Sequence, residues 1–173
     1  MEDSQLAVFK GTYRHRIDAK GRLPVPAVFR RGLDTGSVVV TLLDQCLAAY
    51  PPAEWRRLEQ QLAALPAFGR QVRSLTRLLL SSACDCDLDS QGRILLPPAL
   101  RAVAGLEREA VLIGALDRFE VWRPEAWEQF LKESERLLDD LTLDIPWPLS
   151  PAPVRASDPA PALTPRPQAK PKR

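Results

Sequence analysis

A nine-residue phrase occurs twice in this chain, and such a duplication constrains how the whole chain can fold. Residues 18–26 read Asp-Ala-Lys-Gly-Arg-Leu-Pro-Val-Pro, and residues 89–97 read Asp-Ser-Gln-Gly-Arg-Ile-Leu-Leu-Pro. Both fit the pattern Asp-x-x-Gly-Arg-aliphatic-x-x-Pro. The likeness continues downstream, where residues 50–55 correspond to residues 122–127, each with a tryptophan at the end. The sequence therefore predicts two copies of one structural unit.

The length of the chain favours one core that both copies share. A unit of about 70 residues is only marginally able to bury a core of its own. The full 173 residues, with 45% hydrophobic and 27% charged side chains, are typical of a globular protein. We therefore expect the two halves to pack into each other.

The first copy contains two short strands joined by a turn. Residues 13–17 alternate between arginines and other side chains, which predicts a strand with its arginines on one face. Residues 18–21 form the turn, in which Gly21 can take a positive φ angle. A second strand follows at 22–25, and Pro26 then favours the start of a short helix. The other expected strands are 38–43, 47–50, 84–88, 93–96, 110–113 and 119–122, with another short helix at 97–104.

Longer helices follow each unit. Pro52 opens an amphipathic helix that Pro66 ends, and a second one is expected at 69–81. Pro124 opens a helix to about residue 141. Residues 146–173 contain nine prolines, and we expect this tail to be disordered. The predicted segments are 7–54 (first unit), 55–82 (connecting helices), 83–126 (second unit), 127–145 (C-terminal helix) and 146–173 (tail).

Composition argues against several classes of protein. No stretch approaches the roughly 20 apolar residues of a membrane span, and the first residues do not resemble a secretory signal, so we expect a cytoplasmic protein. Three cysteines, Cys46, Cys84 and Cys86, argue against a disulfide framework. With one histidine in the chain, we expect no metal site and no cofactor.

Basic residues gather at the two ends of the chain. Residues 1–33 carry seven Lys/Arg against three acids, and residues 146–173 carry five bases against one acid. The net charge is +2, so the residues between these ends are acidic. Local basic density is the electrostatic pattern that a polyanion such as DNA requires.

The duplicated phrase and its surroundings resemble the MraZ family of bacterial transcriptional regulators. Phe9-Lys10-Gly11 before the first phrase and Ala53-Glu54-Trp55 after it also fit, and the resemblance covers about residues 7–142. It implies two domains of the AbrB/SpoVT type that interlock into a pseudo-twofold barrel of double-psi or swapped-hairpin kind. The expected fold class is thus α+β, mixed β with short helices.

The resemblance also implies a function. MraZ proteins assemble into rings that bind direct repeats in double-stranded DNA, upstream of the division and cell-wall gene cluster, and usually repress that cluster. Family members are cytoplasmic and nucleoid-associated. We therefore expect a homo-oligomeric, DNA-binding regulator without enzymatic activity or small-molecule substrate.

The first hairpin holds the candidate DNA-binding residues. A two-stranded ribbon fits the major groove of DNA, and arginine can contact both O6 and N7 of guanine. Gly21 would let the loop approach the groove closely. Asp18 either accepts backbone N–H bonds in the turn, the role we favour, or orients an arginine. The candidate DNA-binding residues are Arg14, Arg16, Lys20 and Arg22.

The two copies differ in charge. Where the first copy has Arg14, Arg16 and Lys20, the second has Asp85, Asp87 and Gln91. We therefore predict that the first copy contacts DNA and the second is scaffold or subunit contact. In the second copy Arg93 would pair with Asp85, Asp87 or Asp89, or cross a subunit interface. The residues expected to form the two turns are Asp18, Gly21, Pro26, Asp89, Gly92, Arg93 and Pro97.

Two other functions are weighed against this one. Gly36-Ser37 could suggest self-cleavage to a pyruvoyl enzyme, but it lies in an ordinary turn, and no clustered carboxylates or histidines accompany it. An AbrB-type antitoxin would bind DNA and a protein partner. Such antitoxins are single short domains that dimerise, whereas this chain contains both halves.

Overall fold

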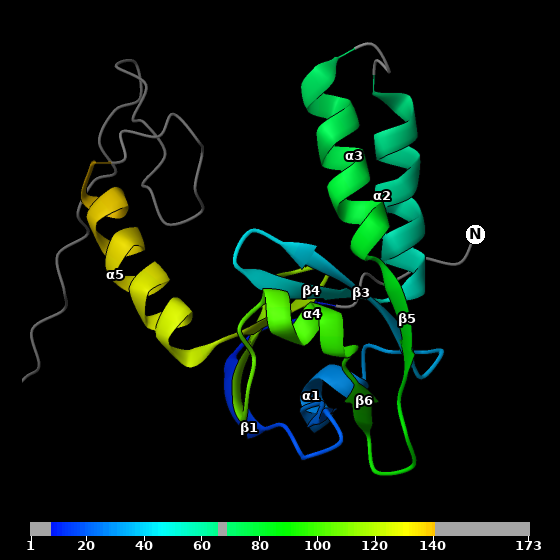
Figure 1. Ribbon diagram of the computed structural model, residues 1–173, viewed down its shortest axis with the longest axis vertical. Coiled ribbons are helices and arrows are strands. Elements are labelled where there is room, and N and C mark those ends of the chain that lie inside the picture. The colour runs from blue at the N-terminus through cyan, green and yellow to red at the C-terminus, as the bar shows by residue number, and fades with distance from the viewer. Residues whose placement is uncertain (1–7, 66–68, 141–173) are drawn as a thin grey trace, which may run out of the picture.

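A computed structural model describes residues 8–65 and 69–140. The described residues form mainly antiparallel strands with helices at both sides (Figure 1). The strands are β1 (Thr12–Arg16), β2 (Arg22–Pro24), β3 (Ser37–Leu43), β4 (Cys46–Tyr50), β5 (Cys84–Asp87), β6 (Arg93–Leu95), β7 (Glu109–Gly114) and β8 (Phe119–Trp122). The helices are α1 (Ala27–Arg30), α2 (Pro52–Ala64), α3 (Arg70–Ser82), α4 (Pro98–Val103) and α5 (Pro124–Asp140).

The duplication is visible in the strand order. Six strands form one sheet in the order β1-β7-β8-β4-β3-β5, and β2 pairs with β6 in a separate ribbon. The strands β1–β4 of the first copy correspond to β5–β8 of the second. When every strand is exchanged for its counterpart, the same order results, read from the opposite edge of the sheet. The first strand of each copy pairs with the third strand of the other, as β1 does with β7 and β5 with β3. The halves are therefore interlocked and neither contains a complete sheet.

Reciprocal hydrogen bonds join the two duplicated phrases. Val25 N–H donates to the carbonyl of Gly92 at 2.9 Å, and Leu96 N–H donates to the carbonyl of Gly21 at 3.0 Å. Between these bonds Leu23 faces Ile94 in the β2–β6 ribbon, and both side chains are fully buried. The phrase thus places one aliphatic residue of each copy at the centre of the shared core.

Aromatic rings fill the core under the first helix. The Phe29 ring of α1 lies 5.7 Å from Phe9, 5.4 Å from Phe119 and 5.1 Å from Tyr13. The core also contains residues from both copies on β3, β7 and β8. Because burying such rings stabilises a fold by several kcal/mol, α1 and β1 are held firmly beside the first turn.

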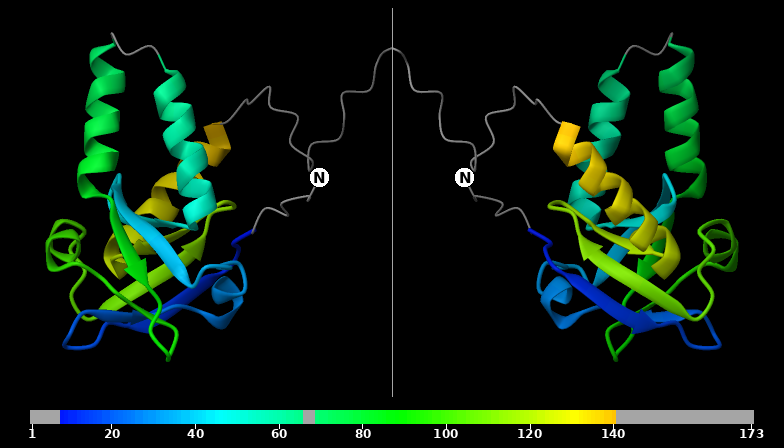
Figure 2. Two further views of the ribbon diagram at one scale, coloured as in Figure 1. Left: turned by 90° about the vertical axis from the view of Figure 1, so that its right-hand side faces the viewer. Right: turned by 90° about the vertical axis from the view of Figure 1, so that its left-hand side faces the viewer.

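The longer helices extend away from the sheet. α2 and α3 rise together at one side of the molecule and α5 lies at the other (Figure 1). α2 and α3 also stay side by side when the molecule is turned by 90° (Figure 2). Trp55 anchors α2 against Tyr50, and Trp122 and Trp127 anchor α5. α3 is tied to the sheet through the buried hydroxyl of Thr41 in β3, which donates to the carbonyl of Leu79 at 2.7 Å. α3 has no counterpart after the second copy among the described residues.

The expected α+β class and the two-repeat organisation are confirmed. The barrel is a correction: the described strands form an open six-stranded sheet and a two-stranded ribbon, with β1 and β5 as unpaired edges, and no closed barrel. The physical reason is that β2 and β6 pair with each other along their length, whereas β6 meets the end of β5 through the isolated bridge between Leu88 and Ile94. The expected disordered tail, 146–173, lies outside the described residues, as does the end of the expected C-terminal helix, 141–145.

Candidate nucleic-acid interface

The first turn is held by the side chain of Asp18. Its Oδ1 accepts the backbone N–H groups of Lys20 and Arg22, both at 2.9 Å, and its Oδ2 accepts Nε of Arg22 at 2.6 Å. Gly21 has a φ of 86° and its N–H donates to the Asp18 carbonyl. Asp18 therefore does both things considered for it, since it caps the turn and orients Arg22. Hydrogen bonding, above all from the Arg22 backbone, lowers its pKa.

The second turn repeats this geometry. Oδ1 of Asp89 accepts the backbone N–H groups of Gln91 and Arg93 at 2.9 Å, and its Oδ2 accepts Nε of Arg93 at 2.8 Å. Gly92 has a φ of 72°. Of the three partners considered for Arg93, the structure thus pairs it with Asp89, and it also approaches Asp18 to 3.9 Å. The Arg93 side chain lowers the pKa of Asp89.

Arginines of the short helices cover both turns. A Cβ atom built on Gly21 would lie 2.9 Å from the guanidinium carbon of Arg101 in α4. The guanidinium of Arg30 in α1 lies over Gly92 in the same way. Each turn is therefore covered by the helix of the other copy. Glycine is favoured in both turns because of its positive φ, since an arginine side chain could move aside from a Cβ atom. Pro26 and Pro97 precede these helices as their N-caps.

The arginines of β1 point away from the core. The side chains of Arg14 and Arg16 are 63% and 86% exposed, whereas His15 between them is half-buried. Each lies near an acid, Arg14 with Glu128 of α5 at 3.0 Å and Arg16 with Glu109 of β7 at 3.6 Å. Exposed ion pairs of this kind contribute little to stability. Arg14 and Arg16 can therefore leave Glu128 and Glu109 and bind another anion, such as a phosphate.

A hollow beside the first turn adds basic residues that sequence reasoning missed. Arg16, Arg101 and Arg108 line it together with Asp18, Glu107 and Glu109. Arg101 and Arg108 belong to the second copy, for which the sequence predicts a role as scaffold or subunit contact. Only the tertiary structure places Arg108 near the first turn. The N–H of Ile17 donates to the Arg108 carbonyl at 2.9 Å, so Arg108 lies beside the end of β1.

The corresponding strand of the second copy is acidic. Asp85 and Asp87 of β5 are exposed, and their strand forms the opposite edge of the six-stranded sheet from β1. Cys84 and Cys86 of β5 both pack on the core side. The two edges of the sheet thus have the same backbone geometry and opposite charge.

No cluster of three or more His, Cys, Asp or Glu side chains that could hold a metal occurs in the described part of the chain. Within residues 8–65 and 69–140, no helix is long and apolar enough to cross a membrane.

Comparison with known proteins decides the family. The family model for the MraZ protein, whose description adds "antitoxin-like", matches residues 8–78 and again 79–142. The chain belongs to the MraZ family. It is 42% identical over 134 residues to the transcriptional regulator MraZ of Pediococcus pentosaceus, which covers 78% of this chain and 94% of that protein. It is 44% identical, over the same shares, to the transcriptional regulator MraZ of Ligilactobacillus salivarius. MraZ membership places the chain among transcriptional regulators.

Proposed function

We propose that this protein regulates transcription as a ring of several copies that binds direct repeats in promoter DNA through the first-copy hairpin. The target is the bacterial division and cell-wall gene cluster, and the effect is repression. The protein acts in the cytoplasm, associated with the nucleoid. The observation that carries the proposal is the contrast between two turns of the same geometry, since the strand before the first turn carries Arg14 and Arg16 and the strand before the second carries Asp85 and Asp87.

The first hairpin has the properties of a groove reader. Arg22 is held by Asp18 and is partly exposed, so its orientation is fixed before it meets DNA. A pre-oriented guanidinium can read guanine in the major groove without further ordering cost. Arg14, Arg16 and Lys20 are exposed around it and supply phosphate contacts.

The second hairpin is unsuited to the same task. Asp85 and Asp87 would face phosphates of the same charge, and Arg93 is more buried than Arg22, with 21% of its side chain exposed against 35%. We propose that this copy is scaffold or subunit contact. One basic hairpin on an otherwise acidic chain binds weakly, so affinity requires several copies on repeated sites.

A matched pair of substitutions tests the proposal. Arg22→Ala and Arg93→Ala each remove one arginine that bonds an aspartate in the same turn geometry, so their local structural cost is similar. In a gel-shift assay with the promoter repeats, Arg22→Ala is expected to lose at least tenfold in affinity, and Arg93→Ala to bind nearly as the unmodified protein does. Equal losses, with both variants still assembled, would overturn the assignment to the first copy.

The alternative is an AbrB-type antitoxin that binds DNA and a protein partner. The words "antitoxin-like" in the family description favour it. Against it stands the internal duplication, because one chain already contains both interlocked halves that a dimeric antitoxin would need. Native mass spectrometry separates the two, since a dimer supports the antitoxin and a larger ring supports the proposed regulator.

A further inference from the structure

The outer face of the β2–β6 ribbon brings one residue of the second copy beside Arg22. In the register of the ribbon, Arg22 lies opposite Leu95. The neighbouring pair, Leu23 and Ile94, is fully buried. Because successive residues of a strand point to opposite faces, the side chains of Arg22 and Leu95 both point away from the core. Side chains that are directly opposed in an antiparallel pair leave the backbone about 5 Å apart.

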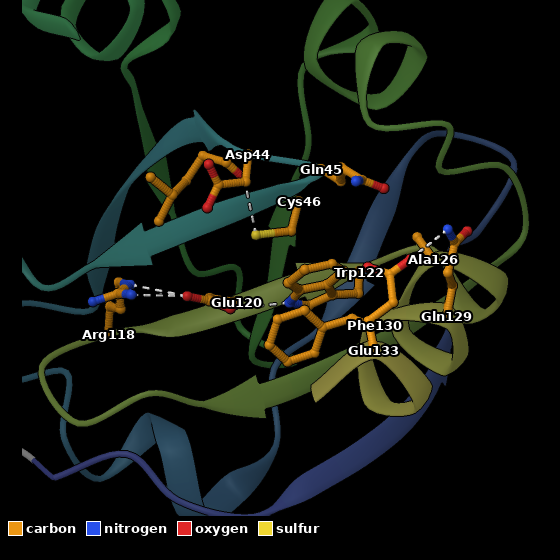
Figure 3. A pocket seen from close by; sticks show the side chains of 11 residues that line it. Asp44, Gln45, Cys46, Arg118, Glu120, Trp122, Ala126, Gln129, Phe130 and Glu133 are labelled. Atoms are coloured by element: carbon orange, nitrogen blue, oxygen red, sulfur yellow. Dashed lines mark hydrogen bonds and ion pairs between the residues drawn. The ribbon is translucent and has the colours of Figure 1, made fainter. Parts of the chain in front are cut away.

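Leu95 is the large apolar side chain of this outer face. It is 57% exposed and lies outside the buried apolar clusters of the described residues. Phe130 provides a contrast, because it is 44% exposed at a hollow beside α5, yet its ring packs against Trp122 (Figure 3) and Trp127. One exposed leucine is not unusual on a protein surface. The residues around Leu95 therefore decide what it can contact.

Two arginines lie near this leucine. Arg22 stands opposite it in the ribbon, and Nε of Arg101 donates to the carbonyl of Leu96, the next residue, at 3.3 Å. The carboxylate of Asp18 is occupied by the backbone N–H groups of its own turn and by Arg22. The ribbon thus presents an apolar side chain between cations, a combination that suits the edges of DNA bases between rows of phosphates.

The ribbon lies where DNA can reach it. β6 is at the end of the molecule away from α2 and α3 (Figure 1), so the long connecting helices do not cover it. In the major groove, the C5-methyl group of thymine is the feature that an apolar side chain recognises. Successive base pairs are about 3.4 Å apart along the helix axis. A side chain about 5 Å from Arg22 therefore meets the base pair next to the one that Arg22 reads.

We propose that Leu95 contacts the methyl group of a thymine in the base pair next to the guanine that Arg22 reads. The inference rests on the proposed function and adds to it a specificity residue from the second copy. The acids of β5 and the second turn keep the role proposed for them, because Leu95 belongs to β6. The counterpart of Leu95 in the first copy is Pro24, which lies opposite Arg93. The ribbon therefore combines an arginine with a leucine at one position only.

Base analogues in the promoter repeats test this contact. Deazaguanine lacks the N7 acceptor, and replacing the guanines one at a time locates the base that Arg22 reads. Its replacement should weaken binding of the unmodified protein but not of Arg22→Ala. Deoxyuridine lacks only the methyl group of thymine. Placing it beside the located guanine is expected to weaken binding of the unmodified protein about fourfold, as measured by fluorescence anisotropy.

A leucine variant links this loss to one side chain. Leu95→Ala is expected to bind the thymine repeat about fourfold more weakly than the unmodified protein and to bind the thymine and uracil repeats equally well. The matched control is Leu116→Ala, since Leu116 is 72% exposed and pairs with Phe9, at the end of β1 away from the first turn. It should keep both the affinity and the fourfold preference for thymine. Thermal melting checks that both variants stay folded.

The outcomes separate this inference from the proposed function. If methyl removal costs the unmodified protein nothing, costs Leu95→Ala as much as the unmodified protein, or finds no thymine beside the located guanine, Leu95 does not read a methyl group and the regulator proposal stands. A lower native mass of Leu95→Ala with its thymine preference retained makes Leu95 a subunit contact and sinks the inference. If the unmodified protein does not bind the repeats, or Arg22→Ala binds them equally well, the proposed function fails and this inference fails with it.

Discussion

Asp18 bonds Arg22 twice, through the backbone N–H at 2.9 Å and through Nε at 2.6 Å. The second turn contains the same two bonds between Asp89 and Arg93. The pattern Asp-x-x-Gly-Arg therefore encodes a turn in which the carboxylate fixes both the backbone and the arginine. What differs between the copies is the charge of the residues around the turn.

Asp18→Asn should separate sequence-specific from general DNA binding. The amide oxygen can still accept the backbone N–H groups, but the ion pair that orients Arg22 is lost. We expect affinity for the promoter repeats to fall about tenfold and affinity for unrelated DNA to rise slightly, because a negative charge has been removed. Asp89→Asn, which makes the same change in the second turn, should leave the ratio of the two affinities unchanged. Fluorescence anisotropy with both DNAs measures that ratio.

The two turn aspartates should make the fold sensitive to acid. Hydrogen bonds lower the pKa of both Asp18 and Asp89 below the ordinary value of 3.8. The unfolded chain therefore takes up protons first, so this stability is present above about pH 4 and is lost as the pH falls through the folded-state pKa values. A variant with Asp18→Asn and Asp89→Asn should melt below the unmodified protein at pH 6, and the gap should narrow toward pH 3. If the difference in melting temperature between the two proteins were the same at pH 6 and pH 3, the acid sensitivity would not come from Asp18 and Asp89.

Gly114 should tolerate no side chain. A Cβ atom there would overlap the backbone of Phe9 and Lys10, and Gly114 N–H also bonds the carbonyl of Gly11. We expect Gly114→Ala to destabilise the fold by about 3 kcal/mol, because backbone cannot move aside as a side chain can. The control is Gly36→Ala, where φ is 65° and no atom lies within 4 Å of the Cβ; it should cost about 1 kcal/mol. Urea denaturation gives both values.

Thr41→Val should loosen α3. The substitution removes the hydroxyl that donates to the Leu79 carbonyl and bonds Ser82. We expect a loss of about 1 kcal/mol, since a buried hydrogen bond is removed and the Leu79 carbonyl keeps only the longer bond from the Ser82 hydroxyl, at 3.3 Å. We also expect faster hydrogen exchange of α3 amides. Ser81→Ala, which removes an exposed hydroxyl bond to Leu78, should change stability by less than about 0.5 kcal/mol. If the α3 amides exchanged hydrogen at the same rate in Thr41→Val and in Ser81→Ala, Thr41 would not anchor the helix.

The three cysteines should differ in reactivity. Burial raises the pKa of Cys86 to about 12 and raises that of Cys46 as well, so both are protonated thiols at pH 8. Cys84 is half-exposed. A thiol reagent should therefore label one cysteine quickly in the folded protein and all three in denaturant. Fewer than three labelled thiols in denaturant without reductant would indicate a disulfide.

The sequence predicted the elements well, since their signals are local. Pro52 and Pro124 begin the long helices as expected, because proline suits the first turn of a helix. The period-two alternation around His15 placed both neighbouring arginines on the exposed face of β1. The order of strands within each copy also repeats as the duplicated phrase predicted.

Pairing between the copies could not be read from the chain. The exchange of β1 and β5 between halves and the open sheet depend on contacts between residues far apart in the chain, such as Val40 with Cys84 and Arg16 with Glu109. The same is true of Arg101 over Gly21 and Arg108 beside β1. No local pattern distinguishes these residues, because an arginine on the short helix α4, or in the segment before β7, has the same sequence signal as any solvated charge.

The sequence by itself determined the turn, its duplication and the charge that distinguishes the copies, because hydrogen bonds from Asp18 and Asp89 span only four residues. Only the tertiary structure decided which strands pair, which acids lie against Arg14 and Arg16, and that Leu78 of α3 and Phe130 of α5 stay exposed. Those features depend on which surfaces the shared core leaves outside, and a core assembled from two interlocked halves is specified by all of its contacts together.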